Sequence, residues 1–393
     1  MGCDGEGTDP VGGRSLHVGL RRHLSPSRCR TDCVQPCWGV HLLAVCWCGS
    51  LGVVPTLATV RTRAIISYGG TGESMMGILV THPGRQHSHQ LAHALHEQNA
   101  LFAYWTGVPS ASASERGPLY RRFARIRHCY VEPLVRRIVD ALCTPPQAIV
   151  SQHRAMEWFD RWCAWQLPDN LDAVVCYENA ALHTFRAAHE RGIPTILDAA
   201  SFHHEWQDAV YDPVESEEAH ARITAHKDRE IRLADLVLTV SELACNSYVE
   251  AGVPEKKVVT VPMGVDESRF ATPSGTKSSA RSEPFTFLLV GHADQRKGAD
   301  ILLKASRRLY TDGANHRVQV AGRVDEGIFS GGASTIEPLG YLNAERLEKA
   351  YKQADVLVLP SRFDSFGRVV VEAMAAGLPA LVSEHVGAKQ VLT

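Results

Sequence analysis

Short apolar runs alternate with amphipathic stretches along the chain from Met76 onward. In the first part, these runs predict strands at Ile78–Thr81, Ala173–Cys176, Thr195–Leu197, Leu236–Val240 and Val258–Val261. Between the strands we expect helices over Ser88–Glu97, over Ala180–Glu190, and from Ser241, a capping residue, to about Gly252. Strands that alternate with helices in this way are typical of βαβ units in a parallel sheet.

A second series of the same kind follows residues 271–283, which are rich in Ser, Thr, Gly, Pro and Lys and predict a linker. Its strands are expected at Phe285–Val290, Val318–Val320, Val356–Leu359 and Ala380–Val382, and its helices at 298–310, Ala344–Gln353 and Phe366–Ala376. We therefore predict an α/β protein of two doubly wound Rossmann-like domains facing across a cleft, 75–270 and 284–393. With about four strands and no closing helices in the second series, we expect an incomplete domain and a fragment.

Residues 1–74 show no periodicity, and we predict a poorly structured leader that precedes the natural start near Met75. The uncharged stretch Cys33–Val60 also fits a signal or an anchor, but Pro and Gly interrupt it, so we expect no stable membrane span. Six of the eleven cysteines lie in this leader. Their spacing lacks the paired C-x2-C halves of a zinc ribbon, and we predict no metal there.

The composition fits two folded domains. The 393 residues are 45% hydrophobic and 21% charged, with a formal net charge of −2. No basic block stands out, so we expect no nucleic-acid partner. The remaining five cysteines are scattered singly, which favours reduced thiols in a cytoplasmic protein, with peripheral contact to a membrane left open.

The strongest motif runs from Asp364 to Pro379 and follows a predicted strand and a Pro-Ser turn. A chain that leaves a strand and opens a helix presents free N–H groups, which can bind a diphosphate. Gly367 permits close approach of the backbone, and Asp364 and Glu372 flank the turn eight residues apart. The alternative is that Asp364 only caps the helix and that Glu372 is a solvated helix residue.

A second motif starts at Gly291, where a strand ends, and presents Arg296 and Lys297 at the start of a helix. Adjacent cations there can stabilise the charge on a departing diphosphate. A solvated basic turn is the commoner fate of such a pair and remains the alternative.

Both motifs resemble the signature of the retaining family 4 glycosyltransferases, which have the two-Rossmann-domain GT-B architecture. The first motif matches that signature at Phe366, Gly367, Glu372, Ala373, Met374, Ala375, Gly377 and Pro379. It departs at Asp364, where the family has Glu; in the second motif Lys297 matches and His292 replaces an Arg. Further segments extend the resemblance over roughly 171–393.

The resemblance implies transfer of a sugar from a nucleotide-diphosphate sugar, with retention, to an acceptor that is a glycan, a lipid or a small molecule. It assigns Glu372 to the ribose, Asp364 to the sugar, and Arg296 and Lys297 to the diphosphate. The remaining donor-binding positions that it implies are Gly291, Gly340, Leu342, Phe366 and Gly367. No metal and no cofactor other than the donor are expected.

Three alternatives remain. A nicotinamide-dependent oxidoreductase needs a G-x-G-x-x-G turn, and Gly70-Thr71-Gly72 lacks the third Gly. A zinc hydrolase could use His89 and His93, which share a helical face but lack an acidic companion. A truncated protein could bind the donor without catalysis. In the N-terminal domain, the turn 82–89 is expected on the acceptor side, Glu178 is a further candidate, and His203 and His204 follow a position where the family often has His.

Overall fold

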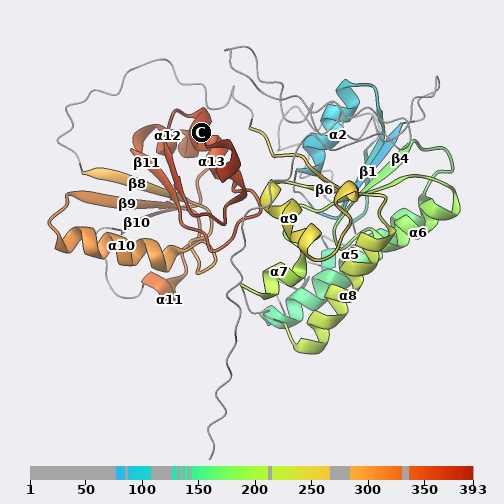
Figure 1. Ribbon diagram of the computed structural model, residues 1–393, viewed down its shortest axis with the longest axis horizontal. Coiled ribbons are helices and arrows are strands. Elements are labelled where there is room, and N and C mark those ends of the chain that lie inside the picture. Colours follow the sequence, from blue (N-terminus) through green and yellow to red (C-terminus); the bar gives the residue numbers. More distant parts are fainter. Residues whose placement is uncertain are drawn as a thin grey trace, which may run out of the picture.

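The computed structural model describes residues 77–84, 87–107, 126–130, 134–135, 138–139, 142, 144–210, 215–265, 284–329 and 336–392. It contains two parallel sheets, each with helices packed against it, which lie on opposite sides of Figure 1. The α/β class and the pair of doubly wound Rossmann-like domains are therefore confirmed. The predictions for the leader 1–74 and the linker 271–283 lie outside the described residues.

In the part of the chain that the structure describes, the N-terminal sheet has seven strands in the order β3-β2-β1-β4-β5-β6-β7. They are β1 (Ile78–His82), β2 (Leu101–Thr106), β3 (Ile126–His128), β4 (Ala173–Tyr177), β5 (Thr195–Asp198), β6 (Leu236–Thr239) and β7 (Val258–Thr260). Its helices are α2 (Ser88–Glu97), α5 (Pro145–Gln166), α6 (Leu182–Glu190), α7 (His204–Asp208), α8 (Glu217–Leu233) and α9 (Glu242–Glu250). All five predicted strands are present because continuous apolar runs are buried on both faces of a parallel sheet. The sequence had not predicted β2, β3, α5, α7 and α8.

Among the described residues, the C-terminal sheet has five strands in the order β10-β9-β8-β11-β12, one more than the four that were predicted. They are β8 (Phe285–Val290), β9 (His316–Ala321), β10 (Ile336–Gly340), β11 (Val356–Leu359) and β12 (Ala380–Val382), with helices α10 (Ala299–Thr311), α11 (Glu326–Phe329), α12 (Ala344–Gln353) and α13 (Arg368–Ala375). The missed strand is β10. It lies at the sheet edge, is largely exposed and contains Pro338, which only an edge position tolerates.

Both sheets reverse the direction of strand order at one point. In the C-terminal sheet β9 and β10 lie on one side of β8, and β11 and β12 lie on the other. In the N-terminal sheet the corresponding point lies between β1 and β4. Ligands of open α/β sheets bind outside the carboxyl ends of strands at such points. The topology therefore marks the loops after β8 and β11, and those after β1 and β4.

One hydrophobic cluster joins the two halves. It contains Ala200, Phe202 and Val240 from the N-terminal half together with Phe366 and Val386 from the C-terminal half. Two hydrogen bonds lie beside it: Ser241 Oγ donates to the Ser365 carbonyl at 2.6 Å, and Ser365 Oγ donates to the Ala200 carbonyl at 2.8 Å. The segment after β5 and the start of α9 therefore contact the turn that precedes α13.

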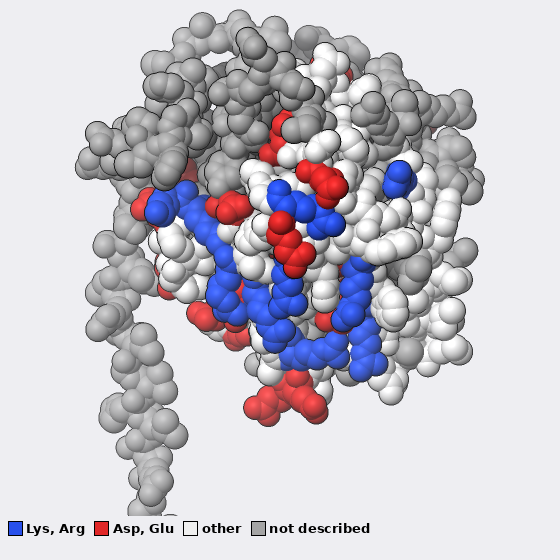
Figure 2. Space-filling model, turned by 90° about the vertical axis from the view of Figure 1, so that its right-hand side faces the viewer, with Lys and Arg blue, Asp and Glu red and all other residues white. Residues whose placement is uncertain are grey.

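Lys and Arg side chains form a connected band across the N-terminal half, with acidic side chains beside it (Figure 2). On this half, Arg191 pairs with Asp169 at 2.9 Å and Arg222 pairs with Glu157 at 2.9 Å. Part of the arginine charge is thus compensated within the protein. In the part of the chain that the structure describes, no helix combines the length and the apolarity that a membrane crossing needs.

Candidate functional site

The two motifs meet at the carboxyl ends of the neighbouring strands β8 and β11. Gly298 begins α10 in the left-handed conformation (φ 71°), and a Cβ at this residue would come within 1.9 Å of the Pro360 carbonyl oxygen. The start of α10 therefore packs directly against the end of β11. At this place the Lys297 ammonium contacts the Asp364 carboxylate, and both side chains are nearly buried. The backbone N–H of Lys297 donates to Asp294 Oδ1 at 2.7 Å, which fixes the turn. Two predicted site residues are therefore direct partners.

The turn before α13 is held by its backbone. Asp364 donates its N–H to the His385 carbonyl and accepts from the Gly387 N–H, both at 2.9 Å. Gly367 is the N-cap of α13, with φ 82° and no side-chain cap. A Cβ there would lie 2.9 Å from Val386 Cγ1, so glycine is required both sterically and conformationally. The alternative that Asp364 is a helix cap is therefore wrong.

Glu372 lies on the buried face of α13 and is 7% exposed. Its Oε2 accepts from the Tyr351 hydroxyl at 3.0 Å, and its Oε1 accepts from Arg368 Nε at 3.1 Å. The alternative of a solvated helix residue is wrong. Burial and the Glu372 charge raise the pKa of Tyr351 well above its usual value, so the hydroxyl remains a donor. Neither Tyr351 nor Arg368 was predicted as a partner of Glu372, although Arg368 and Glu372 have the i, i+4 spacing of neighbours on a helix.

Arg296 faces a different partner from Lys297. Its guanidinium carbon lies 5.6 Å from the centre of the Phe363 ring, and its carbonyl accepts from the Arg362 N–H at 2.8 Å. Arg362, which the sequence did not single out, binds both carboxylate oxygens of Asp300 at 2.8 and 2.9 Å. These bonds lower the pKa of Asp300 and raise that of Arg362. This pair joins the start of α10 to the loop after β11.

The remaining donor-site candidates fall into two groups. Gly291 (φ 123°) directly follows β8 and Gly340 (φ 67°) is the last residue of β10; both have a positive φ, where glycine is favoured. Leu342 is half-buried against the shared hydrophobic cluster. Phe366 is 2% exposed, so its side chain fills the core and only its backbone can meet a ligand. Gly322 was missed: a Cβ there would lie 2.1 Å from the Gly291 carbonyl oxygen.

A second set of polar side chains lies at the N-terminal reversal point. The rings of His82, at the end of β1, and Tyr177, at the end of β4, are 4.2 Å apart. His87 Nε2 lies 2.6 Å from Asp198 Oδ2, and both side chains are buried. Burial, reinforced by His87, lowers the pKa of His82 to about 3, so this ring is neutral near pH 7. The turn 82–89 was predicted, whereas Tyr177 and Asp198 were not.

Glu178 belongs to a buried network. One oxygen accepts from Ser201 Oγ at 2.6 Å and the other pairs with Lys227 Nζ at 3.0 Å. Burial disfavours the Lys227 charge, but Glu178 outweighs this and raises the Lys227 pKa. Among the described residues, the group with metal-type spacing is His203, His204 and Asp228, and it includes neither His89 nor His93. The zinc-hydrolase alternative is therefore not supported by the geometry.

Residues 274–393 match the family model described as glycosyl transferases group 1. The mannosylfructose-phosphate synthase of Agrobacterium fabrum is 28% identical over 186 residues, which cover 40% of this chain and 39% of that protein. The D-inositol 3-phosphate glycosyltransferase of Segniliparus rotundus is 31% identical over 173 residues, 38% of each chain. The chain thus matches less than half of the length of these curated relatives.

Solved structures share the two-sheet architecture over 81% of this chain, at low sequence identity. Anabaena HepE, crystallised with UDP and glucose, has a TM-score of 0.55 and 14% identity over 81% of this chain and 83% of that chain. The sucrose-phosphate synthase of Thermosynechococcus elongatus has a TM-score of 0.57 and 15% identity over the same shares. At this identity the likeness establishes the GT-B fold.

Proposed function

We propose, since residues 274–393 match the group 1 glycosyltransferase family, that the protein transfers a sugar from a nucleotide-diphosphate sugar to an acceptor, with retention. One observation carries the proposal: Lys297 and Asp364 meet beside the start of α13, where the strand order of the C-terminal sheet reverses. A cation, a carboxylate and a helix N-terminus at one place suit a ligand that joins a diphosphate to a sugar.

Lys297 would bind the diphosphate. In the absence of donor its charge is compensated by Asp364, and an incoming phosphate, with more negative charge, would compete for the ammonium. The N–H groups at the start of α13 add positive potential without a metal ion. Asp364 would then be released to accept hydrogen bonds from the sugar. Lys297 and α13 together would stabilise the departing diphosphate.

Glu372 would bind the ribose. Its two oxygens each accept one internal hydrogen bond, and a carboxylate oxygen has a second acceptor site. The internal bonds from Tyr351 and Arg368 fix the orientation of the carboxylate, so little freedom is lost when a pentose diol binds. Gly340 and Leu342 would lie near the base. The complexes of Anabaena HepE with UDP and with UDP-glucose support a nucleotide-sugar donor for this fold.

The acceptor would approach from the loops after β1 and β4, where His82, Tyr177 and the His87–Asp198 pair lie. The fully buried free thiols Cys163 and Cys176 support a reducing, cytoplasmic setting.

Isothermal titration with a panel of nucleotide sugars tests the proposal. We expect saturable binding of a nucleotide sugar that is lost in Glu372→Ala. The control Glu384→Ala, which changes a side chain that is 81% exposed, should keep this binding. Binding of NAD in place of a sugar nucleotide would contradict it. NMR of the anomeric centre of the product then tests retention. A protein that binds the donor but transfers to no acceptor would be the catalytically impaired, truncated alternative.

A further inference from the structure

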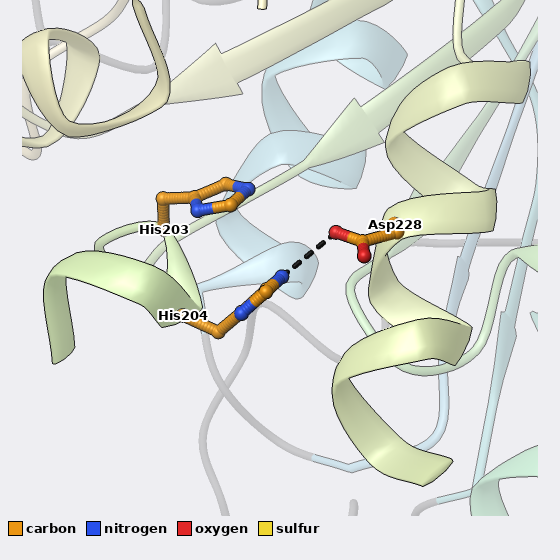
Figure 3. Close-up of side chains that lie close together, drawn as sticks. All are labelled: His203, His204 and Asp228. Carbon is orange, nitrogen blue, oxygen red and sulfur yellow. Dashed lines mark hydrogen bonds and ion pairs between the residues drawn. The ribbon is translucent and has the colours of Figure 1, made fainter. Parts of the chain in front are cut away.

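Two consecutive histidines and an aspartate converge where α7 meets α8. His203 precedes α7, His204 begins it, and Asp228 lies on α8. Figure 3 shows the His204 ring directed at the Asp228 carboxylate, with the His203 ring beside it. One nitrogen from each ring and one oxygen of Asp228 lie within 4.8 Å of one another. Three side chains with lone pairs thus surround one small volume.

The contacts already present explain only part of this arrangement. His204 Nε2 lies 2.7 Å from Asp228 Oδ1, which is a complete hydrogen-bonded pair. The His203 ring, 4% exposed, lies 4.3 Å from the His204 ring and 5.2 Å from the Tyr248 ring. Burial and the neighbouring His204 lower the pKa of His203. His203 Nδ1 accepts from the Glu205 N–H at 3.3 Å and so caps α7, which leaves Nε2 as the ring nitrogen for a further ligand.

We propose that His203, His204 and Asp228 bind a zinc ion. Two imidazole nitrogens and one carboxylate oxygen, with water in the fourth position, form a common tetrahedral zinc environment. Bonds of about 2.0–2.1 Å to zinc place the ligand atoms about 3.3 Å apart. The 2.7 Å contact between His204 and Asp228 would lengthen, and the widest spacing within the 4.8 Å group would shorten, by rotation of the side chains.

Charge and access favour a cation at this position. Asp228 and the nearby Glu178 and Glu205 place negative charge around His203. Lys227 compensates Glu178, which leaves the other two carboxylates. The Asp228 side chain is 37% exposed, so a hydrated ion can reach it from solvent, whereas both imidazoles are buried.

The ion would fasten the segment after β5 to α8. His220 on α8 already holds Asp208, at the end of α7, at 2.9 Å. At the other end, Phe202 stacks on Trp206 at 4.2 Å and lies 6.1 Å from the Phe363 ring, next to Asp364. Zinc would therefore stiffen the N-terminal side of the contact between the two halves, independently of the donor site.

The test measures zinc on the full-length protein, dialysed against Zn²⁺ with a weak competing chelator and analysed for metal. We expect about one zinc ion per chain to depend on the cluster. His204→Gln and Asp228→Asn should each weaken zinc binding at least about 100-fold, because even loss of a residue that only hydrogen-bonds to a metal ligand lowers affinity about 10- to 100-fold. His220→Gln is the matched control, because His220 on α8 also pairs with carboxylates but lies outside the cluster. Circular dichroism confirms that each variant is folded.

Co²⁺ substitution separates this site from other ligands. Tetrahedral d–d absorption without a thiolate charge-transfer band is expected, and it should disappear in Asp228→Asn. A thiolate band would place the metal on the cysteines and overturn the proposal. The same holds if all variants keep the wild-type zinc content, or if His220→Gln loses as much zinc as His204→Gln. None of these readouts depends on sugar transfer.

Discussion

The C-terminal half has two of its candidate donor-site residues on loops, whereas the N-terminal half buries charged side chains between its helices. In the C-terminal half, Lys297 and Asp364 lie on turns set by Gly298 and Gly367, after adjacent strands. In the N-terminal half, several charged groups are held deep in the fold. The first arrangement follows from local backbone geometry, and the second from contacts between distant helices.

Two buried carboxylates show the second arrangement clearly. Asp160, on α5, accepts from the N–H groups of His183 and Thr184, and Glu230, on α8, accepts from the N–H groups of Asn179 and Ala181. Both carboxylates are 0% exposed. Together they satisfy N–H groups at and before the start of α6, which lacks a side-chain cap of its own. Charge thus has a structural role in one half and a proposed catalytic role in the other.

The largest expected effect is that of Lys297→Met on catalysis. Removing the cation should lower kcat/KM by up to about 10³-fold, or about 4 kcal/mol, because stabilisation of the leaving diphosphate is lost. Steady-state kinetics with the donor found by titration measures it. Lys304→Met, an exposed lysine of α10, should stay within twofold of wild type. An active Lys297 variant would remove the proposed difference between the two halves.

Asp160→Ala should act on stability instead. It leaves the buried N–H groups of His183 and Thr184 and the Thr184 hydroxyl without their acceptor. We expect the free energy of unfolding to fall by about 3 kcal/mol, measured by urea denaturation. Asp169→Ala removes an exposed partner of Arg191 and should cost under about 1 kcal/mol. If Asp160→Ala and Asp169→Ala lowered the free energy of unfolding equally, burial of the Asp160 carboxylate would not explain the loss.

Glu372→Gln should weaken donor binding by about 10- to 100-fold, since hydrogen bonds to a charged group contribute about 1.5–3 kcal/mol. The isosteric amide keeps the volume and can still accept from Tyr351, so the fold should persist. The dissociation constant of the donor, by calorimetry, is the measurement, with Glu384→Gln as control. An unchanged dissociation constant would show that Glu372 does not bind the ribose and that its role is limited to the hydrogen bond with Tyr351.

The smallest effect concerns acid sensitivity. His82 is held neutral in the folded protein, with a pKa near 3, but titrates near 6.5 when unfolded. The unfolded chain therefore binds more protons below pH 6.5, and stability falls as the pH decreases. From pH 7 to pH 5.5 this one group should contribute a loss of about 1 kcal/mol. His82→Gln should flatten the pH dependence by that amount in denaturation series; an unchanged slope would contradict the assignment.

Much of the fold was visible in the sequence. The strands Phe285–Val290 and Val356–Leu359 and the helices Ser88–Glu97 and Ala344–Gln353 lie where they were predicted, because continuous apolar runs and amphipathic periods are local signals. The edge strand β10 and the helix α8 were not predicted. The buried side of α8 carries His226 and Glu230 together with Ile231, so its apolar period is weak. β2 is a continuous apolar and aromatic run, so its signal was available.

The sequence by itself determined two α/β series and the residue types of the donor motifs. Only the tertiary structure decided which side chains meet. Lys297 and Asp364 are 67 residues apart, His87 and Asp198 are 111 apart, and Ser241 and Ser365 are 124 apart. Such pairs depend on the order in which strands enter each sheet, which local periodicity does not encode. The same reason hid the cluster of His203, His204 and Asp228, whose third member comes from another helix.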